Sequence, residues 1–363
     1  MRARRRYVSP DEDSSRWDGF DFRDGDIVIS SRSKHGTTWL QMIALVLIHQ
    51  TPDLPAPLGR LSPWLDHVVE PRDAVTARLA AQAHRRVIKT HTPLDGIPVD
   101  PRVTYFVVAR HPLDAAASLY HQAANLDRDR LQRLTGAEAA VTSGFRPPLR
   151  QWLVTWIDRD PDPRDELDSL PGVMWHLSDA WARRTSDHIA LVHYADLAAD
   201  LDGQMLRLAD QLGTAVPADK WTVLVHAATF DRMRARAERL VPDPVGVLHD
   251  PAAFFRRGTS ADGTALLSPA QLERYRRRTA ALAPPDLLSW LHRKYDLPPP
   301  PPSAREAVYR SISRGGCRSS SRNASRSRAT RCGARSTPRV WSIARLWPRR
   351  CPMASTHPWS WVA

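Results

Sequence analysis

The chain has 363 residues, of which 42% are hydrophobic, so it can hold one large α/β domain with a tail or two average domains. The formal net charge of +13 first suggests a nucleic-acid partner. However, residues 303–363 carry 13 Arg and a single acid, so the body before them is nearly neutral. We therefore expect no nucleic-acid binding by the body.

The positions of the cysteines and the hydropathy pattern argue against a disulfide-stabilised, membrane-spanning or secreted protein. Every Cys of the chain lies in the tail, at Cys317, Cys332 and Cys351, so the body has no disulfide framework. No run of about 18 apolar residues predicts a transmembrane helix, and the basic start lacks the apolar segment of a secretory signal. These features predict a cytoplasmic protein whose residues 1–16 are a mobile basic lead-in. The sequence leaves open whether it is a monomer or a homo-oligomer.

The first predicted strand, residues 27–29, runs into a short polar loop and then into an apolar helix at 36–50. The loop carries Lys34 and Gly36, and two threonines open the helix. Loop amides and the positive end of such a helix point at one spot, which suits a phosphate. The loop is not a Walker A motif, in which Lys follows Gly and directly precedes Ser or Thr.

The rest of the body alternates between strand and helix patterns. In chain order we expect a helix at 73–84, a strand at 85–91, a strand at 103–109, a helix from Pro112, a helix at 174–184, a strand at 189–194, and helices at 197–212, 218–228 and 268–283, the last with Ser268 as N-cap. Residues 127–172 are polar and Pro-rich and remain unassigned. The alternation predicts an α/β fold, with a P-loop-like parallel sheet flanked by helices on both faces.

Polar side chains end the predicted strands. Lys34, His91, Arg110 and Tyr194 all fall where a strand stops. Ligands of open parallel sheets bind outside the carboxyl ends of the strands, so these residues are candidates for one site.

The chain changes character after residue 297. Five prolines at 298–302 precede an Arg/Ser-rich stretch without helix or strand period, which predicts disorder. We therefore expect a single domain at 17–297 and a disordered tail at 298–363. Because charge, Cys use and periodicity change together, out-of-frame translation is an alternative origin for the tail. An RNA- or lipid-binding arm is another.

The loop after the first strand resembles the 5′-phosphosulfate loop of cytosolic-type sulfotransferases, which reads Pro-Lys-Ser-Gly-Thr-Thr-Trp. The matching residues are Lys34, Gly36, Thr37, Thr38 and Trp39, whereas Arg32, Ser33 and His35 depart from the family pattern. The resemblance implies the donor 3′-phosphoadenosine 5′-phosphosulfate (PAPS). It assigns Lys34 to the bridging oxygen, the loop amides and threonines to the 5′-phosphate, and Trp39 to the adenine.

Later segments follow in family order. Residues 89–93 resemble the Lys-Thr-His-x-Pro segment whose His is the catalytic base, which gives His91 that role and places Lys89 beside it. An alcohol needs such a base because it is a poor nucleophile until its proton leaves. The remaining matches imply a 3′-phosphate site and further donor contacts, at Arg110, Ser118, Tyr194, Thr229, Arg256, Arg257 and Gly258. The family's Gly-Asp-Trp is only Ala261-Asp262-Gly263 here.

Residues 62–66, 89–96, 254–258 and 283–288 look most like mycobacterial glycolipid-type sulfotransferases. The resemblance implies sulfuryl transfer from PAPS to a hydroxyl of a lipophilic acceptor, a glycolipid or another alcohol or phenol, without a metal. Lys34 and Lys89 would neutralise the leaving oxygen. The apolar acceptor pocket has four candidates, Trp64, Leu65, Trp152 and Trp156. Two alternatives stay open: an inactive protein that binds PAPS or its product PAP, and a P-loop nucleotide kinase that needs Mg²⁺.

Overall fold

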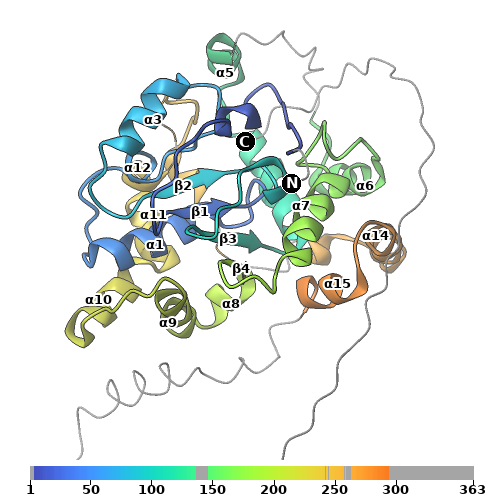
Figure 1. Cartoon of the computed structure of the whole chain (residues 1–363). Helices are drawn as coiled ribbons and strands as arrows, with labels where there is room; N and C mark the ends of the chain where they lie inside the picture. Colours follow the sequence, from blue (N-terminus) through green and yellow to red (C-terminus); the bar gives the residue numbers. More distant parts are fainter. Residues whose placement is uncertain are drawn as a thin grey trace, which may run out of the picture.

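A four-stranded parallel sheet organises the part of the chain that the computed structural model describes, namely residues 4–135, 146–241, 243, 245–256, 258 and 263–293 (Figure 1). The strands are β1 (Ile27–Ser30), β2 (Val87–Thr90), β3 (Thr104–Ala109) and β4 (Ile189–His193), in the order β2-β1-β3-β4. All three pairings are parallel. The predicted parallel α/β sheet is confirmed, and the carboxyl ends of its strands share one edge.

Helices and 3-10 turns connect the strands. They are η1 (Ser14–Trp17), α1 (Thr37–His49), α2 (Leu58–Leu61), α3 (Arg72–Ala80), η2 (Leu94–Gly96), α4 (Pro112–Ala123), α5 (Arg128–Thr135), α6 (Leu149–Asp158), α7 (Leu170–Ala182), α8 (Tyr194–Ala199), α9 (Leu201–Gln211), α10 (Ala218–Ala227), α11 (Phe230–Ala235), α12 (Ala237–Leu240), α13 (Pro251–Phe254), η3 (Thr264–Leu266), α14 (Pro269–Leu282) and α15 (Pro285–Leu291). As predicted, Ser268 caps α14. No helix in the described ranges is long and apolar enough to cross a membrane.

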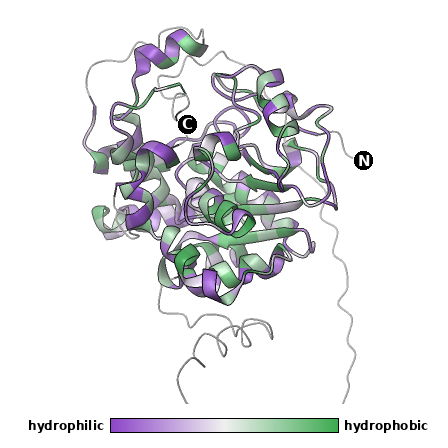
Figure 2. Cartoon of the chain, turned by 90° about the vertical axis from the view of Figure 1, so that its left-hand side faces the viewer, coloured by the Kyte–Doolittle hydropathy of each residue, from purple (hydrophilic) through white to green (hydrophobic). Residues whose placement is uncertain are grey.

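The sheet is buried on both faces, as the continuous apolar strands predicted. Successive strand side chains point to opposite faces. Ile27 and Ile29 therefore pack with α1 and α9 to α12, whereas Val28 packs with α6, α7, α14 and α15. Figure 1 shows these two groups of helices on either side of the strands, and Figure 2 shows the apolar residues gathered along the sheet.

The N-terminal segment differs from the expected mobile lead-in. In the described residues 4–16 it packs against the body: Tyr7 is only 2% exposed, and the Arg5 amide donates to the Asp95 carbonyl at 3.0 Å. Glu12 forms a β-bridge with His67. The basic residues of the segment gave no sign of these buried partners, so its packing went unpredicted.

Some expected element bounds were also wrong. Strand β2 ends at Thr90, before His91, and Tyr194 opens α8 instead of ending β4. The helix expected at 197–212 is interrupted at Asp200, whose carboxylate accepts from the Gly203 amide and caps α9. The unassigned residues 127–172 include α5, α6 and the start of α7. The predictions for 294–363 lie outside the described residues.

Candidate active site

A cavity of about 150 Å³ lies at the carboxyl edge of the sheet, and residues that follow all four strands line it. It brings together most of the predicted site residues: Lys34, Gly36, Thr37, Thr38, Trp39, Lys89, His91, Arg110, Ser118, Tyr194, Arg256 and Gly258. Thr229 is not among the lining residues, and its hydroxyl donates to the His226 carbonyl at 2.8 Å. Arg257 lies outside the described residues.

The loop between β1 and α1 has a backbone that demands glycine at one position. Gly36 has a φ of 110°, and a Cβ there would lie 2.9 Å from the Tyr194 ring. Lys34 also takes a left-handed conformation, with a φ of 64°. The hydroxyls of Ser31 and Thr37 lie 2.5 Å apart and tie the end of β1 to the start of α1. The loop therefore presents Lys34 and the first amides of α1 to the cavity.

Lys34 is a half-buried cation among other cations. Its Nζ donates to Gln122 Oε1 at 3.3 Å and lies 3.8 Å from the centroid of the Phe254 ring. Burial first, and then the charges of Arg110, Lys89 and Arg256, lower the pKa of Lys34 to about 7. Positive charge is costly in this cavity until an anion enters, so the site suits a polyanionic ligand.

Lys89, at the end of β2, supports the same electrostatic pattern. Its Nζ lies 3.7 Å from the centroid of the Trp64 ring, and burial lowers its pKa to about 8. Trp64 lines the cavity, as one of the candidates for an apolar pocket. Leu65, Trp152 and Trp156 do not line it and pack in or against the core beside the sheet.

His91 is held in a neutral form with a defined tautomer. Burial, together with Lys89 and Arg32, keeps its pKa well below the ordinary value. Its Nδ1 contacts the Ser31 carbonyl oxygen, which can only accept, so Nδ1 carries the proton. The ring therefore offers the lone pair of Nε2, which is what a general base needs.

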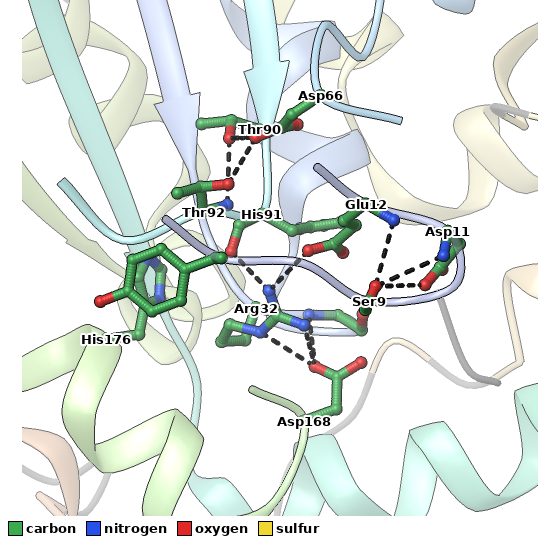
Figure 3. A network of polar contacts seen from close by, with 12 residues as sticks. Ser9, Asp11, Glu12, Arg32, Asp66, Thr90, His91, Thr92, Asp168 and His176 are labelled. Carbon is green, nitrogen blue, oxygen red and sulfur yellow. Dashed lines mark hydrogen bonds and ion pairs between the residues drawn. The ribbon is translucent and has the colours of Figure 1, made fainter. Parts of the chain in front are cut away.

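The backbone on either side of His91 is fixed by one carboxylate. Thr90 and Thr92 both donate their hydroxyls to Asp66 Oδ2, the latter at 2.6 Å (Figure 3). The indole of Trp17 donates to the same oxygen at 3.1 Å. Asp66 thus holds the end of β2 in a constant place relative to the cavity.

Aromatic side chains and Arg110 form another wall. The guanidinium carbon of Arg110 lies 4.4 Å from the centroid of the Tyr194 ring, and Tyr194 meets Trp39 edge-on with centroids 5.1 Å apart. The Trp39 indole donates to the Ala228 carbonyl at 2.8 Å. Ser118 on α4 also lines the cavity. A planar ring and a phosphate would both find partners on this wall.

The remaining wall was foreseen only in part. It consists mainly of apolar side chains with one amide and one acid: Gln122, Leu126, Phe230, Met233, Val241, Asp243, Val247, Leu248, Phe254 and Phe255. Backbone hydrogen bonds join its segments, from the Asp127 amide to the Val247 carbonyl at 2.7 Å and from the His249 amide to the Asn125 carbonyl at 2.9 Å. Phe230 with Met233, and Phe254 with Phe255, belong to stretches that resemble family segments. Leu126, Asp243, Val247 and Leu248 come from loops without a motif, so no local signal could have placed them here. Ser33 and Trp64 complete the lining.

Within the described ranges, no group of three or more His, Cys, Asp or Glu side chains is arranged to hold a metal ion. Asp243, the one carboxylate among the described lining residues, accepts from the amides of Val247 and Leu248 at 2.8 and 2.9 Å. Cations and a neutral imidazole are prominent among the polar side chains that the structure describes in this lining.

Comparison with known proteins gives consistent matches. Residues 24–284 match the family model of the sulfotransferase domain. A glycolipid sulfotransferase of Mycobacterium bovis is 42% identical over 314 residues, which cover 80% of this chain and 95% of that protein. A glycolipid sulfotransferase of Mycobacterium tuberculosis is 42% identical over 311 residues, with the same coverage.

Solved structures support the fold. A retinol dehydratase in complex with retinol and PAP superposes with a TM-score of 0.56 at 19% identity, covering 79% of this chain and 86% of that one. Mouse sulfotransferase SULT7A1 complexed with PAP has a TM-score of 0.53 at 19% identity, covering 77% and 89%. At these identities the two likenesses concern the architecture alone.

Proposed function

The chain belongs to the sulfotransferase family, and on that premise we propose that it moves a sulfuryl group from PAPS to a hydroxyl of a lipophilic acceptor. One observation carries the proposal. The cavity joins four cationic side chains, Lys34, Lys89, Arg110 and Arg256, with the neutral imidazole of His91. Cations suit a polyanionic donor, and a neutral imidazole suits the removal of a proton from an alcohol.

The donor contacts follow from this arrangement. The loop amides with Thr37 and Thr38 bind the 5′-phosphate at the start of α1. Arg110, Ser118 and Arg256 hold the 3′-phosphate, where a guanidinium offers a forked contact. Trp39 and Tyr194 flank the adenine. PAP in the neighbouring retinol dehydratase and mouse sulfotransferase structures is consistent with this donor.

In the transfer step, His91 Nε2 takes the proton of the acceptor hydroxyl while the hydroxyl oxygen forms its bond to sulfur. The bond between sulfur and the bridging oxygen breaks, and Lys34 and Lys89 neutralise the charge left on that oxygen. One well-placed donor of this kind contributes about 3 kcal/mol of transition-state stabilisation. Most of the catalysis is therefore positioning and electrostatics.

The acceptor end is apolar. Leu126, Val247, Leu248 and Phe254 line the cavity, and two relatives at 42% identity are glycolipid sulfotransferases. Both observations support a glycolipid or another lipophilic alcohol as the acceptor.

Incubation of the full chain with radiolabelled PAPS and a panel of glycolipids, phenols and steroids tests the proposal. We expect PAP release and a sulfate adduct on a lipid by mass analysis, unaffected by a metal chelator. Binding of PAP without transfer to any member of the panel would indicate an inactive nucleotide-binding protein. Phosphoryl transfer that a chelator abolishes would indicate a nucleotide kinase.

Arg110→Ala is expected to weaken PAP binding by about 10- to 100-fold, because a charge-assisted contact to phosphate is worth about 1.5–3 kcal/mol. Adenosine 5′-phosphate, which lacks the 3′-phosphate, should bind both forms with similar affinity. Calorimetric titration measures both ligands. Arg150→Ala, at an exposed arginine outside the cavity, is the matched control. An equal loss for the two nucleotides would contradict the 3′-phosphate assignment.

A further inference from the structure

A buried ion-pair network lies directly behind His91, and we propose that the N-terminal segment, residues 7–16, positions this histidine through Glu12 and Arg32. The inference rests on the proposed function, in which His91 is the base. It makes Glu12 and Arg32 positioning residues, which act on the reaction through His91.

Arg32 joins three parts of the chain (Figure 3). Its Nη1 donates to the carbonyl oxygen of His91 and lies 3.4 Å from Glu12 Oε2. Its Nε and Nη2 lie 3.1 and 2.9 Å from Asp168 Oδ1, just before α7. One guanidinium therefore ties the end of β2, the N-terminal segment and the entry to α7 together.

Arg32 is also linked to the ring of His91 through its own backbone. Arg32 follows Ser31 in the chain, and the Ser31 carbonyl accepts from His91 Nδ1. The guanidinium of Arg32 thus holds the carbonyl of His91, and its backbone is bonded to the residue whose carbonyl orients the imidazole. A displacement of about 1 Å in a reacting group can cost about 100-fold in rate, so this clamp matters for the base.

Backbone pairing brings Glu12 to this position. The Asp13 amide donates to the Asp66 carbonyl at 2.8 Å, and the Val68 amide donates to the Asp11 carbonyl at 2.9 Å. This pairing leaves Glu12 5% exposed, with its carboxylate next to Arg32. It would form with almost any side chain at position 12, so the pairing does not itself require a carboxylate there.

A carboxylate at this place has a specific electrostatic role. Arg32 is 3% exposed, and a buried guanidinium needs negative partners. Without Glu12, Asp168 is left as the carboxylate that contacts Arg32, and the hold on the His91 carbonyl becomes looser. The segment is thus part of the active site although, among its described residues, none lines the cavity.

Ionisation of Glu12 gives the network a pH dependence. Burial raises the pKa of Glu12 to about 8, with Asp11, Asp66 and Asp168 acting in the same direction and Arg32 in the opposite one. Lys89 also feels the charge of Glu12, and His67 is its bridge partner. The carboxylate is therefore half charged near pH 8 and almost fully charged above about pH 9, where its hold on Arg32 is strongest.

The test compares wild type with Glu12→Gln, which resembles the protonated acid. Turnover at saturating substrates is measured between about pH 6 and pH 9.5 and expressed per PAP-binding site. Above about pH 9 we expect kcat to be about tenfold lower in the variant than in wild type, with both KM values and PAP affinity unchanged. Below pH 7 the two proteins should converge. A merely structural role would change the number of binding sites or the melting temperature, and it would not produce a difference that depends on pH.

Two further measurements keep the outcomes distinct. Arg6→Ala alters an exposed ion pair with Asp13 in the same segment and should leave kcat unchanged. Nitrogen NMR of labelled histidine, with His91 assigned by its loss in His91→Gln, should show the Nδ1–H form in wild type and a mixed or shifted signal in Glu12→Gln. Equal kcat at every pH, or an unchanged His91 signal, would overturn the inference. A wild type that transfers no sulfate to any acceptor would refute the proposed function instead, and the NMR result would still decide the positioning role.

Discussion

His91→Gln is expected to lower kcat by about 10²- to 10⁴-fold, the range typical of a lost general base. The glutamine amide has no basic lone pair on nitrogen, so the acceptor proton has no place to go in the transition state. PAP affinity should stay within about threefold, because the buried imidazole is neutral and contributes no charge to anion binding.

Single-turnover kinetics with the preformed donor complex measures the rate of the transfer step apart from binding. Calorimetry measures the affinity for PAP. His226→Gln is the matched control, since His226 is exposed and does not line the cavity. Turnover of His91→Gln close to that of wild type would remove His91 from its role. A parallel loss of PAP binding would instead indicate that the substitution disturbs the cavity as a whole.

The sequence predicted the sheet because its strands carry strong local signals. Continuous apolar runs, such as residues 27–29 in β1 and 105–109 in β3, have few alternatives to a strand covered on both faces. The polar residue after each run then has a defined place, since parallel strands end at one edge. That is why Lys34, His91, Arg110 and Tyr194 could be assigned to one site before their contacts were known.

Long-range contacts could not be predicted in the same way. Glu12 and Arg32 are far from each other in sequence, and neither belongs to a periodic pattern that predicts burial. Leu126 and Leu248 form an isolated β-bridge between two loops. A single leucine in a loop belongs to no repeating pattern, so the sequence does not indicate which residue it pairs with. Thr229 was assigned to the donor site because its segment follows the others in the family order. In the structure its hydroxyl instead donates to the carbonyl of His226, three residues earlier in the chain.

His35 shows that a departure from a family pattern need not alter the site. A bulky residue replaces the usual small one in the donor loop, but its ring is 1% exposed and is not among the residues that line the cavity. Its Nδ1 lies 3.0 Å from the Ser33 carbonyl, and burial lowers its pKa to about 4. His35 is therefore neutral at physiological pH and adds no charge beside Lys34.

Lys34→Met should lower kcat by about 10²- to 10³-fold, the loss expected for one donor at the developing negative charge. The effect has a second, pH-dependent signature. With its pKa lowered to about 7, Lys34 is about one-tenth protonated at pH 8 in the free protein and becomes charged when PAP binds. At pH 8, wild type should therefore take up close to one proton through Lys34 when it binds PAP. Because this proton must be supplied by the solvent, the affinity for PAP should weaken as the pH rises above 7.

Calorimetry in two buffers of different ionisation enthalpy measures this uptake. Lys89, whose pKa is lowered to about 8, contributes roughly half a proton at pH 8 and should still do so in the variant. Lys34→Met should thus lose most of the uptake but not all of it, whereas Lys220→Met, at an exposed lysine on α10, should lose none. If wild type and Lys34→Met took up the same number of protons, Lys34 would already be charged in the free protein. Burial and the charges of Arg110, Lys89 and Arg256 would then not lower the pKa of Lys34 in the way that the geometry requires. The coupling between donor binding and the charge of Lys34 at the leaving oxygen would be refuted.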